Sequence, residues 1–368
     1  MSFKEWKEYK LGELGKLARG KSKHRPRDAA FLYGGIYPFI QTGDIKSANH
    51  KIRKHSQTLS NEGLKQSKLW DAGTICLTIA ANIGDSGILT YPACFPDSVL
   101  GFVVDNSKAD AEFIEYLLQF YKKNIQSHAI GSVQDNINLG TFENIKFKIP
   151  TFETQKKISF LLSSLDEKIE LNRRTNQTLE TIAQTLFKEM CVPTSKILPE
   201  GWKVVLLNNV LEIKYGKDHK HLENGSIPLY GSGGIMRFVN KSLYEEESIL
   251  IPRKGTLSNL FYINKPFWSV DTMFYTKIKD KIHTKFLFLL LKSMNLATMN
   301  VGSAVPSLTT EILNRLEIFI PPISILKSFD LRVTPFFEML EINEEENKTL
   351  IATRDILLPK LMKGEIEL

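Results

Sequence analysis

Residues 162–190 read LSSLDEKIELNRRTNQTLETIAQTLFKEM, and residues 333–361 read VTPFFEMLEINEEENKTLIATRDILLPKL. A shift of 171 residues, the interval from Asn172 to Asn343, keeps the two stretches in register without a gap. Identical residues then coincide at Glu167, Glu170, Asn172, Asn176, Thr178, Leu179 and Leu186 with Glu338, Glu341, Asn343, Asn347, Thr349, Leu350 and Leu357. This agreement indicates an internal repeat, so the chain contains two copies of one unit.

Both stretches have the hydrophobic spacing of a coiled coil. Seam residues recur at alternating intervals of three and four, which is the a/d pattern. The first seam is Leu162, Leu165, Ile169, Asn172, Asn176, Leu179, Ala183, Leu186 and Met190. The second is Val333, Phe336, Leu340, Asn343, Asn347, Leu350, Arg354, Leu357 and Leu361, and Pro335 and Pro359 should weaken it. We therefore predict two helices, each roughly 50 Å long at 1.5 Å per residue.

Four asparagines in these seams bear on how the helices pack. A polar residue at an a or d position costs stability and is tolerated chiefly where it fixes register or orientation. An antiparallel pair about a pseudo-twofold axis would bring Asn172 and Asn176 against Asn343 and Asn347. We predict this arrangement because it places one globular part at each end of the pair. A parallel pair and two ordinary core helices are the alternatives.

Each helix follows a globular part that ends in an Ile-Pro pair, at 149–150 and 320–321. Strands are predicted at 74–80, 248–252 and 274–278, and helices near 111–125 and 284–294. The predicted fold class is α+β, with two mixed α/β domains held apart by two long helices packed as an antiparallel coiled coil. The predicted divisions are 1–152 for the first domain, 153–192 for its helix, 193–198 for a linker, 199–322 for the second domain and 323–368 for its helix.

The composition points to a folded intracellular protein. The chain has 368 residues, and 42% hydrophobic with 24% charged residues excludes disorder as its main state. No apolar run approaches the roughly 18 residues of a membrane span, and residues 1–6 lack the apolar core of a secretory signal. Three widely spaced cysteines, Cys76, Cys94 and Cys191, suit buried thiols in a reducing compartment. We therefore expect a cytoplasmic location.

The charge distribution favours an anionic partner. The formal net charge is +7, and the isoelectric point is near 9.0. Basic and polar residues gather in loop-like segments of both globular parts, where lysine and arginine suit phosphates and the polar types suit base edges. The candidate DNA-binding residues are Lys21, Lys23, Arg25, Arg27, Gln41, Thr42, Asp44, Lys46 and Asn82, then Lys217, Lys220, Tyr230, Ser232, Arg253, Lys254 and Asn259. Solvated loops are the alternative interpretation of these segments.

The motifs of common catalytic sites are absent or out of context. Residues 15–22 match the phosphate-binding loop pattern formally, but Pro26 follows too closely for the helix that such a loop requires. An amino-group methyltransferase would need an Asn/Asp-Pro-Pro-aromatic loop, and the chain has none. His219 and His221 lack the partners of a metal site. We therefore expect no catalytic and no metal-binding residues.

The helical segments resemble those of the specificity (S) subunits of Type I restriction-modification enzymes. The residues that carry the resemblance are Ile149 and Pro150 with Gln155 and Ile158, the run from Leu165 to Asn172, the ending from Arg354 to Met362 with Gly364, Glu365 and Ile366, and the run from Pro199 to Trp202. The resemblance covers the whole chain in architecture and about a quarter of it in specific motif.

This resemblance implies a sequence-specific DNA-binding subunit that is not itself an enzyme. Two target recognition domains would each read one half of a bipartite site, and the helices would set the spacing and dock other subunits. The implied partners are double-stranded DNA, two modification (methyltransferase) subunits and ATP-dependent restriction subunits. S-adenosylmethionine would belong to the modification subunits, with no cofactor in this chain.

Two other functions remain open at this point. An assembly adaptor of similar shape would read little DNA, and replacing its basic loop residues would leave the phenotype unchanged. A nucleotide-binding enzyme would require binding at Gly20 and Lys21, which a binding assay could exclude.

Overall fold

The computed structural model describes residues 6–368 apart from 27, 81, 131–139, 141, 143–144, 194–197 and 300–306. The chain forms two compact units, which are Met1–Asn172 with Glu345–Leu368 (unit 1) and Arg173–Glu344 (unit 2). Each unit holds one globular part and half of each long helix. Most of the predicted linker 193–198 lies outside the described residues.

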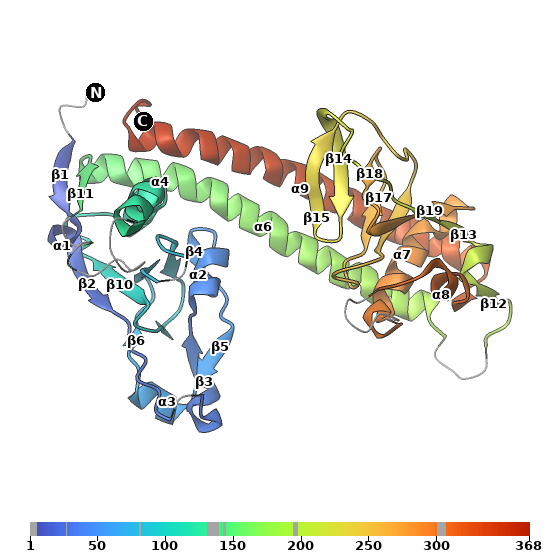
Figure 1. The fold of residues 1–368 in the computed structure, drawn as a ribbon, viewed down its shortest axis with the longest axis horizontal. Helices are drawn as coiled ribbons and strands as arrows, with labels where there is room; N and C mark the ends of the chain where they lie inside the picture. The colour runs from blue at the N-terminus through green and yellow to red at the C-terminus, as the bar shows by residue number, and fades with distance from the viewer. Residues whose placement is uncertain are drawn as a thin grey trace. The chain divides into compact units, whose positions relative to one another are not determined.

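The globular part of unit 1 is built from short strands in three sheets and one long helix (Figure 1). In chain order its elements are β1 (Lys7–Lys10), α1 (Leu11–Leu14), β2 (Gly15–Arg19), β3 (Tyr33–Phe39), α2 (Thr42–Ser47), β4 (Lys51–Ile52), β5 (Gln57–Leu59), α3 (Asn61–Lys65), β6 (Leu69–Trp70), β7 (Ile75–Thr78), β8 (Ser86–Leu89), β9 (Ala93–Cys94), β10 (Val99–Val104), α4 (Ala111–Ile130) and β11 (Lys146–Ile149). The sheets have the strand orders β1-β11, β2-β10-β7-β8-β4 and β5-β3-β9-β6.

The globular part of unit 2 has the same plan with fewer elements. They are β12 (Lys203–Leu206), β13 (Leu211–Tyr215), β14 (Asn224–Gly231), β15 (Gly234–Val239), β16 (Ser248–Pro252), β17 (Phe261–Ile263), β18 (Trp268–Ser269), β19 (Met273–Ile278), α7 (Thr284–Ser293), α8 (Thr310–Asn314) and β20 (Glu317–Ile320). The sheet orders β12-β20, β13-β19-β16-β17 and β15-β14-β18 repeat those of unit 1. Unit 1 adds α2, α3, β4 and β6 to this common frame.

The predicted strands and helices of the globular parts are confirmed. Strands β7, β16 and β19 and helices α4 and α7 lie where the hydrophobic patterns placed them. Residues 15–22, which match the phosphate-loop pattern, fall on β2 and on residues that form no helix.

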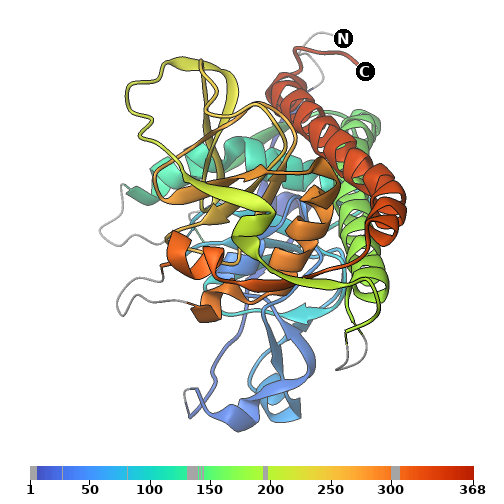
Figure 2. The ribbon, with the colours of Figure 1, turned by 90° about the vertical axis from the view of Figure 1, so that its right-hand side faces the viewer.

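Two 40-residue helices, α6 (Phe152–Cys191) and α9 (Ile323–Met362), run side by side in Figures 1 and 2. In unit 1, Leu162 and Leu361 belong to one apolar cluster, and in unit 2 Ala183 and Val333 belong to another. The early part of each helix therefore meets the late part of the other, so the predicted antiparallel pairing is confirmed. Every predicted seam residue is buried or half-buried.

The two prolines do not interrupt the second helix, and the expected weakening of its seam stays a prediction. Helix α9 is continuous through Pro335 and Pro359. Pro335 is exposed, whereas Val333 and Phe337 on either side of it are buried in the unit 2 core. Tertiary packing of the apolar face therefore compensates for the hydrogen bond that proline cannot donate.

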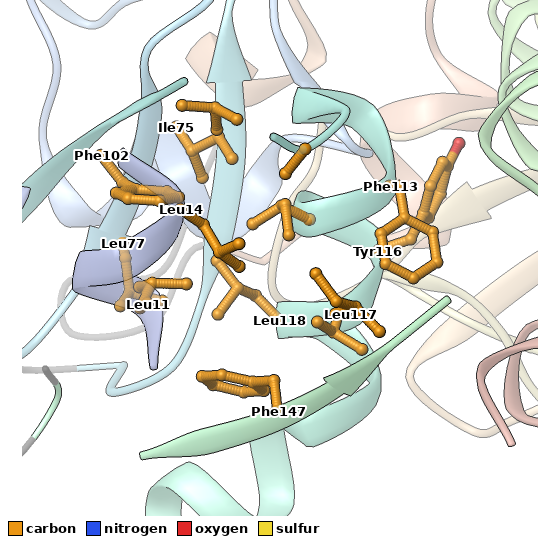
Figure 3. Close-up of a cluster of buried hydrophobic side chains, with 14 of the residues drawn as sticks. Leu11, Leu14, Ile75, Leu77, Phe102, Phe113, Tyr116, Leu117, Leu118 and Phe147 are labelled. Atoms are coloured by element: carbon orange, nitrogen blue, oxygen red, sulfur yellow. The ribbon is translucent and has the colours of Figure 1, made fainter. Parts of the chain in front are cut away.

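The apolar core of unit 1 lies between its sheets, α4 and the long helices (Figure 3). Leu11, Phe102, Phe113 and Phe147 are each at most 1% exposed. Burying a side chain of this size contributes about 1.5–3 kcal/mol each. The core therefore joins the globular part and the helix pair of unit 1 into one packed body.

Candidate nucleic-acid interface

A Gly-Lys pair follows the first strand of the central sheet in unit 1. The Gly20 amide donates to the Val99 carbonyl at 2.8 Å, and the Lys21 amide donates to the Phe95 carbonyl at 3.1 Å. A Cβ atom on Gly20 would lie 2.2 Å from the Pro96 oxygen. Only glycine therefore permits this close approach, which leaves the Lys21 side chain exposed.

Unit 2 repeats this arrangement with different residues around it. The amides of Gly216 and Lys217 donate to the carbonyls of Met273 and Ser269, both at 2.9 Å. A Cβ atom on Gly216 would lie 2.0 Å from the Val270 oxygen. Each globular part thus presents an exposed lysine from an equivalent position that backbone hydrogen bonds define.

A second group of candidate residues follows β3 and lies near Lys21. Strand β3 runs parallel to β9, and beyond it the Ile40 amide donates to the Cys94 carbonyl at 2.8 Å. The Lys21 amide binds the next residue, Phe95. The segment that carries Lys21 and the segment that follows β3 are therefore both bound to residues 94–95. Gln41 and the start of α2 therefore lie beside the lysine segment.

Helix α2 carries the candidate residues Thr42, Asp44 and Lys46. The Asp44 carboxylate accepts hydrogen bonds from the Gln41 amide at 2.8 Å and from the Ser56 hydroxyl at 2.9 Å. The Gln41 side chain donates to that of Gln57 at 3.0 Å. Asp44 is therefore occupied in shaping the helix start, and Ser56 and Gln57 join this polar face although no sequence pattern marks them.

Lys46 and Asn82 meet although they are far apart in sequence. The Lys46 ammonium donates to the Asn82 side-chain oxygen at 3.2 Å, and both residues are exposed. Asn82 has a φ of 31°, a conformation that asparagine tolerates better than most residues. The structure thus adds Asn82 to the face of α2.

Two further basic candidates of unit 1, Lys23 and Arg25, are bound to a different segment. The amides of Lys23 and Arg25 donate to the backbone and side-chain oxygens of Gln66, at 3.3 and 2.6 Å. Between them His24 is buried, and this burial lowers the pKa of its imidazole. Lys23 and Arg25 are therefore held beside α3 and not beside α2, while Arg27 lies outside the described residues.

In unit 2 the end of β14 lies beside the lysine segment. The Val270 amide donates to the Tyr230 carbonyl at 3.0 Å, next to the residue that binds Lys217. Just beyond Tyr230, the Ser232 carbonyl accepts a hydrogen bond from the Asn259 side chain at 3.0 Å. These four candidates are therefore brought together.

Arg253 and Lys254 join the same region through the segment after β18. Both amides donate to the Thr272 carbonyl, and the Arg253 guanidinium donates to the Asp271 carbonyl at 3.3 Å. Its charge lies 5.4 Å from the centre of the Tyr215 ring. Lys220 stands apart in the turn after Asp218.

Arg237 is an important residue of unit 2 that the sequence patterns do not indicate. Its guanidinium donates to the His219 carbonyl at 2.7 Å and to the Leu222 carbonyl at 3.1 Å. It therefore holds the turn that carries Lys220. An isolated arginine in a strand gives no sequence signal for such a contact.

The seam asparagines make hydrogen bonds within each unit. In unit 1 the Asn172 amide donates to the Asn347 oxygen at 3.0 Å and to the Glu346 carboxylate at 2.7 Å. In unit 2 the Asn343 amide donates to the Asn176 oxygen at 2.7 Å. These pairs satisfy polar groups at the middle of the antiparallel seam.

Within the described ranges, His, Cys, Asp and Glu side chains form no group of three that could hold a metal ion. Over the same part of the chain, every helix is too short or too polar to cross a membrane. Cys76, Cys94 and Cys191 are free and buried, as predicted. Burial raises the pKa of the Cys191 thiol to about 12.

Three relatives show what the chain is similar to. The MjaIX specificity subunit of a Type I restriction enzyme from Methanocaldococcus jannaschii is 25% identical, over 99% of this chain and 94% of its own. The HindI specificity subunit from Haemophilus influenzae is 23% identical, over 98% of this chain and 100% of its own. The crystal structure of a Type I restriction-modification S subunit from M. genitalium has the same fold, with a TM-score of 0.67 at 18% identity, over 97% of this chain and 96% of that one.

A family model also matches the chain twice, once for each copy of the repeat. The matched residues are 3–181 and 199–351, which together exceed half of the chain. The chain belongs to the family described as the Type I restriction modification DNA specificity domain.

Proposed function

We propose that this chain is the DNA-recognition subunit of a Type I restriction-modification complex and that each globular part reads one half of a bipartite site. The observation that carries the proposal is the duplicated Gly-Lys geometry, at Gly20 and Lys21 and again at Gly216 and Lys217. Two equivalent lysines in one chain suit two phosphate contacts, one in each half-site. Polar residues beside these lysines, which differ between the two units, supply the contacts to bases.

The antiparallel helices set the spacing between the half-sites in this proposal. Their exposed faces dock two modification subunits, and restriction subunits complete the complex. The chain itself supplies recognition and no chemistry. S-adenosylmethionine enters with the modification subunits, and the cytoplasmic location stays a prediction.

The test is to co-express the chain with its modification subunits and to map adenine methylation across a genome by single-molecule sequencing. A bipartite methylated motif supports the proposal. Replacing residues 1–152 with the corresponding domain of another family member should change one half of the motif only. A stable complex that methylates no defined motif would favour an assembly adaptor instead.

A matched set of lysine variants tests the duplicated geometry. Lys21→Ala and Lys217→Ala should each weaken DNA binding about equally on all sequences and reduce the slope of log affinity against log salt by about one. Lys281→Ala is the control. Lys217 binds Ser269, which precedes β19, whereas Lys281 follows the end of that strand, and the Lys281 side chain is 71% exposed. An unchanged salt slope in both lysine variants would contradict the phosphate role.

A further inference from the structure

Three consecutive residues after α2 point polar side chains at the helices of unit 1. Asn49 reaches α6 and α9, His50 reaches α4, and the Lys51 ammonium binds Glu112 of α4 at 2.7 Å and Glu167 of α6 at 3.0 Å. α2 ends at Ser47, so the candidate DNA-reading helix leads directly into this segment. Hydrogen bonds and ion pairs of this segment therefore link the end of α2 to the long helices.

Asp166 of α6 is the centre of these contacts. Its side chain is 5% exposed, and one oxygen accepts hydrogen bonds from the Asn49 amide at 2.9 Å and from the Arg354 guanidinium at 2.7 Å. The other oxygen accepts the Tyr116 hydroxyl at 2.6 Å. Arg354 also donates to the Asn49 oxygen at 2.7 Å, which closes a ring of three side chains. We call Asn49, Tyr116, Asp166 and Arg354 the polar junction.

His50 strengthens the link between this segment and α4. Its side chain is 1% exposed, its ring stacks on Tyr116 at 3.9 Å between centroids and 7° between planes, and its Nδ1 binds the Glu115 carboxylate. The residue has a φ of 64°, in the left-handed region that non-glycine residues rarely adopt. Such a conformation persists only where the surroundings determine it, so the contacts of the side chain fix the backbone just after α2.

The contacts of the polar junction fix the orientation of the first globular part more than they contribute to its stability. Burying a charge pair adds little stability compared with apolar packing, but its hydrogen bonds hold only in one geometry. A slip of the first globular part on the helices would leave Asp166 buried without its Asn49 partner. The junction therefore admits one position of α2 relative to the helix pair of unit 1.

We infer that Asn49, through Asp166 and Arg354, is a positioning residue that sets how α2 is presented to the first half-site. This inference rests on the proposed function and assigns the junction to the reading of one half-site. Asn49 makes its two bonds to the helices without taking part in the Asp166 to Arg354 bond, so it can be removed while that bond remains.

The experiment uses the full chain with its modification subunits and the motif found for the wild-type complex. Asn49→Ala is compared with Asn264→Ala, in which a globular asparagine of unit 2 loses its 2.8 Å bond to Glu341 of α9. Binding is measured on matched DNA and on DNA with one base changed in either half-site. A specific base pair is worth on the order of tenfold or more in affinity, which sets the scale of the discrimination ratio.

The expected result is a loss of about tenfold in discrimination at the first half-site by Asn49→Ala, with the second half-site unchanged. Asn264→Ala should keep the first half-site ratio. A general loss of folding would lower the active fraction of the complex but would leave both ratios intact. Unchanged ratios in Asn49→Ala, or equal losses at both half-sites, would overturn the inference. Absence of any motif in the wild-type complex would instead reject the proposed function.

Discussion

The two units differ in how the globular part contacts the helix pair at equivalent positions, through a charged pair in unit 1 and through apolar side chains in unit 2. The repeat shift places Asp166 on Phe337 and Arg354 on Ala183, so the charged pair of unit 1 corresponds to an aromatic and a small residue of one apolar cluster in unit 2. Phe337 packs on the rings of Tyr262 at 4.9 Å and Phe288 at 5.9 Å. We call Ala183, Tyr262, Phe288 and Phe337 the apolar junction.

This difference separates two requirements of a junction between a domain and a helix pair. Apolar packing stabilises without strict directionality, whereas a hydrogen-bonded ring fixes an orientation at little net gain in stability. Unit 1 has the additional helix α2 next to its junction, and unit 2 has a hairpin between β14 and β15 in the corresponding place. The polar junction thus occurs in the unit whose candidate reading element is a separate helix.

The largest effect should come from moving the charged pair into unit 2. The double variant Ala183→Arg and Phe337→Asp removes a buried ring and places a carboxylate among the rings of Tyr262 and Phe288. We expect a loss of roughly 5 kcal/mol or more in the free energy of unfolding of unit 2, from urea denaturation of the full chain. A loss below about 1 kcal/mol would show that the two junctions are interchangeable.

Breaking the polar junction from one side should have the next largest effect. Arg354→Leu leaves Asp166 buried without its countercharge and should cost about 3 kcal/mol in the free energy of unfolding of unit 1. Adding Asp166→Leu should recover part of that loss, because the uncompensated charge is removed. Chemical denaturation of both variants measures the difference in their free energies of unfolding. A double variant that is much less stable than the single variant would contradict this account.

Replacing a seam asparagine pair should have a smaller effect of opposite sign. Asn176→Leu combined with Asn343→Leu should raise the free energy of unfolding by about 1 kcal/mol, because a half-buried and a buried polar group give way to apolar packing. Either single variant should be destabilising, since it leaves one amide without its partner. The melting temperatures of the three variants decide the matter, and a destabilised double variant would show that the pair contributes stability as well as register.

The smallest effect concerns pH and distinguishes unit 1. Burial acts to raise the pKa of the Glu112 carboxyl, but the hydrogen bond and charge of Lys51 outweigh it and hold this pKa below its usual value of 4.5. A lowered folded pKa means that the stabilisation is present above the unfolded pKa and is lost as the pH falls through the folded one. The stability of unit 1 should therefore decline as the pH falls below the usual glutamate pKa of 4.5, and Glu112→Gln should flatten this decline. An unchanged slope in denaturation curves would exclude Glu112 as a source.

The sequence predicts the frame of this protein well because the signals are periodic and repeated. Seam residues such as Leu162 and Val333 recur at coiled-coil intervals, and the same shift brings the asparagines into coincidence. Strands β7, β16 and β19 are short apolar runs with clear ends. These features depend on neighbouring residues, so they can be recognised without knowledge of the tertiary structure.

The contacts that orient the first globular part could not be predicted in this way. Asn49 and Asp166 are far apart in the chain, and the pairing of their side chains follows from the packing of α4 against α6. Arg354 fits the seam spacing, and its charge alone indicates an acidic partner without identifying Asp166. Helix α2 escapes detection because it is short and contains Gly43. The DNA contacts of individual candidate residues remain predictions for the same reason.

The duplicated Gly-Lys geometry also has an evolutionary consequence. Backbone amides and carbonyls fix the positions of Lys21 and Lys217, so the attachment does not depend on the identity of the side chains around them. Neighbouring surface positions can therefore change without disturbing this attachment, whereas a side chain at either glycine would clash with the backbone. A lineage could acquire a new target sequence in this way without passing through an unfolded intermediate.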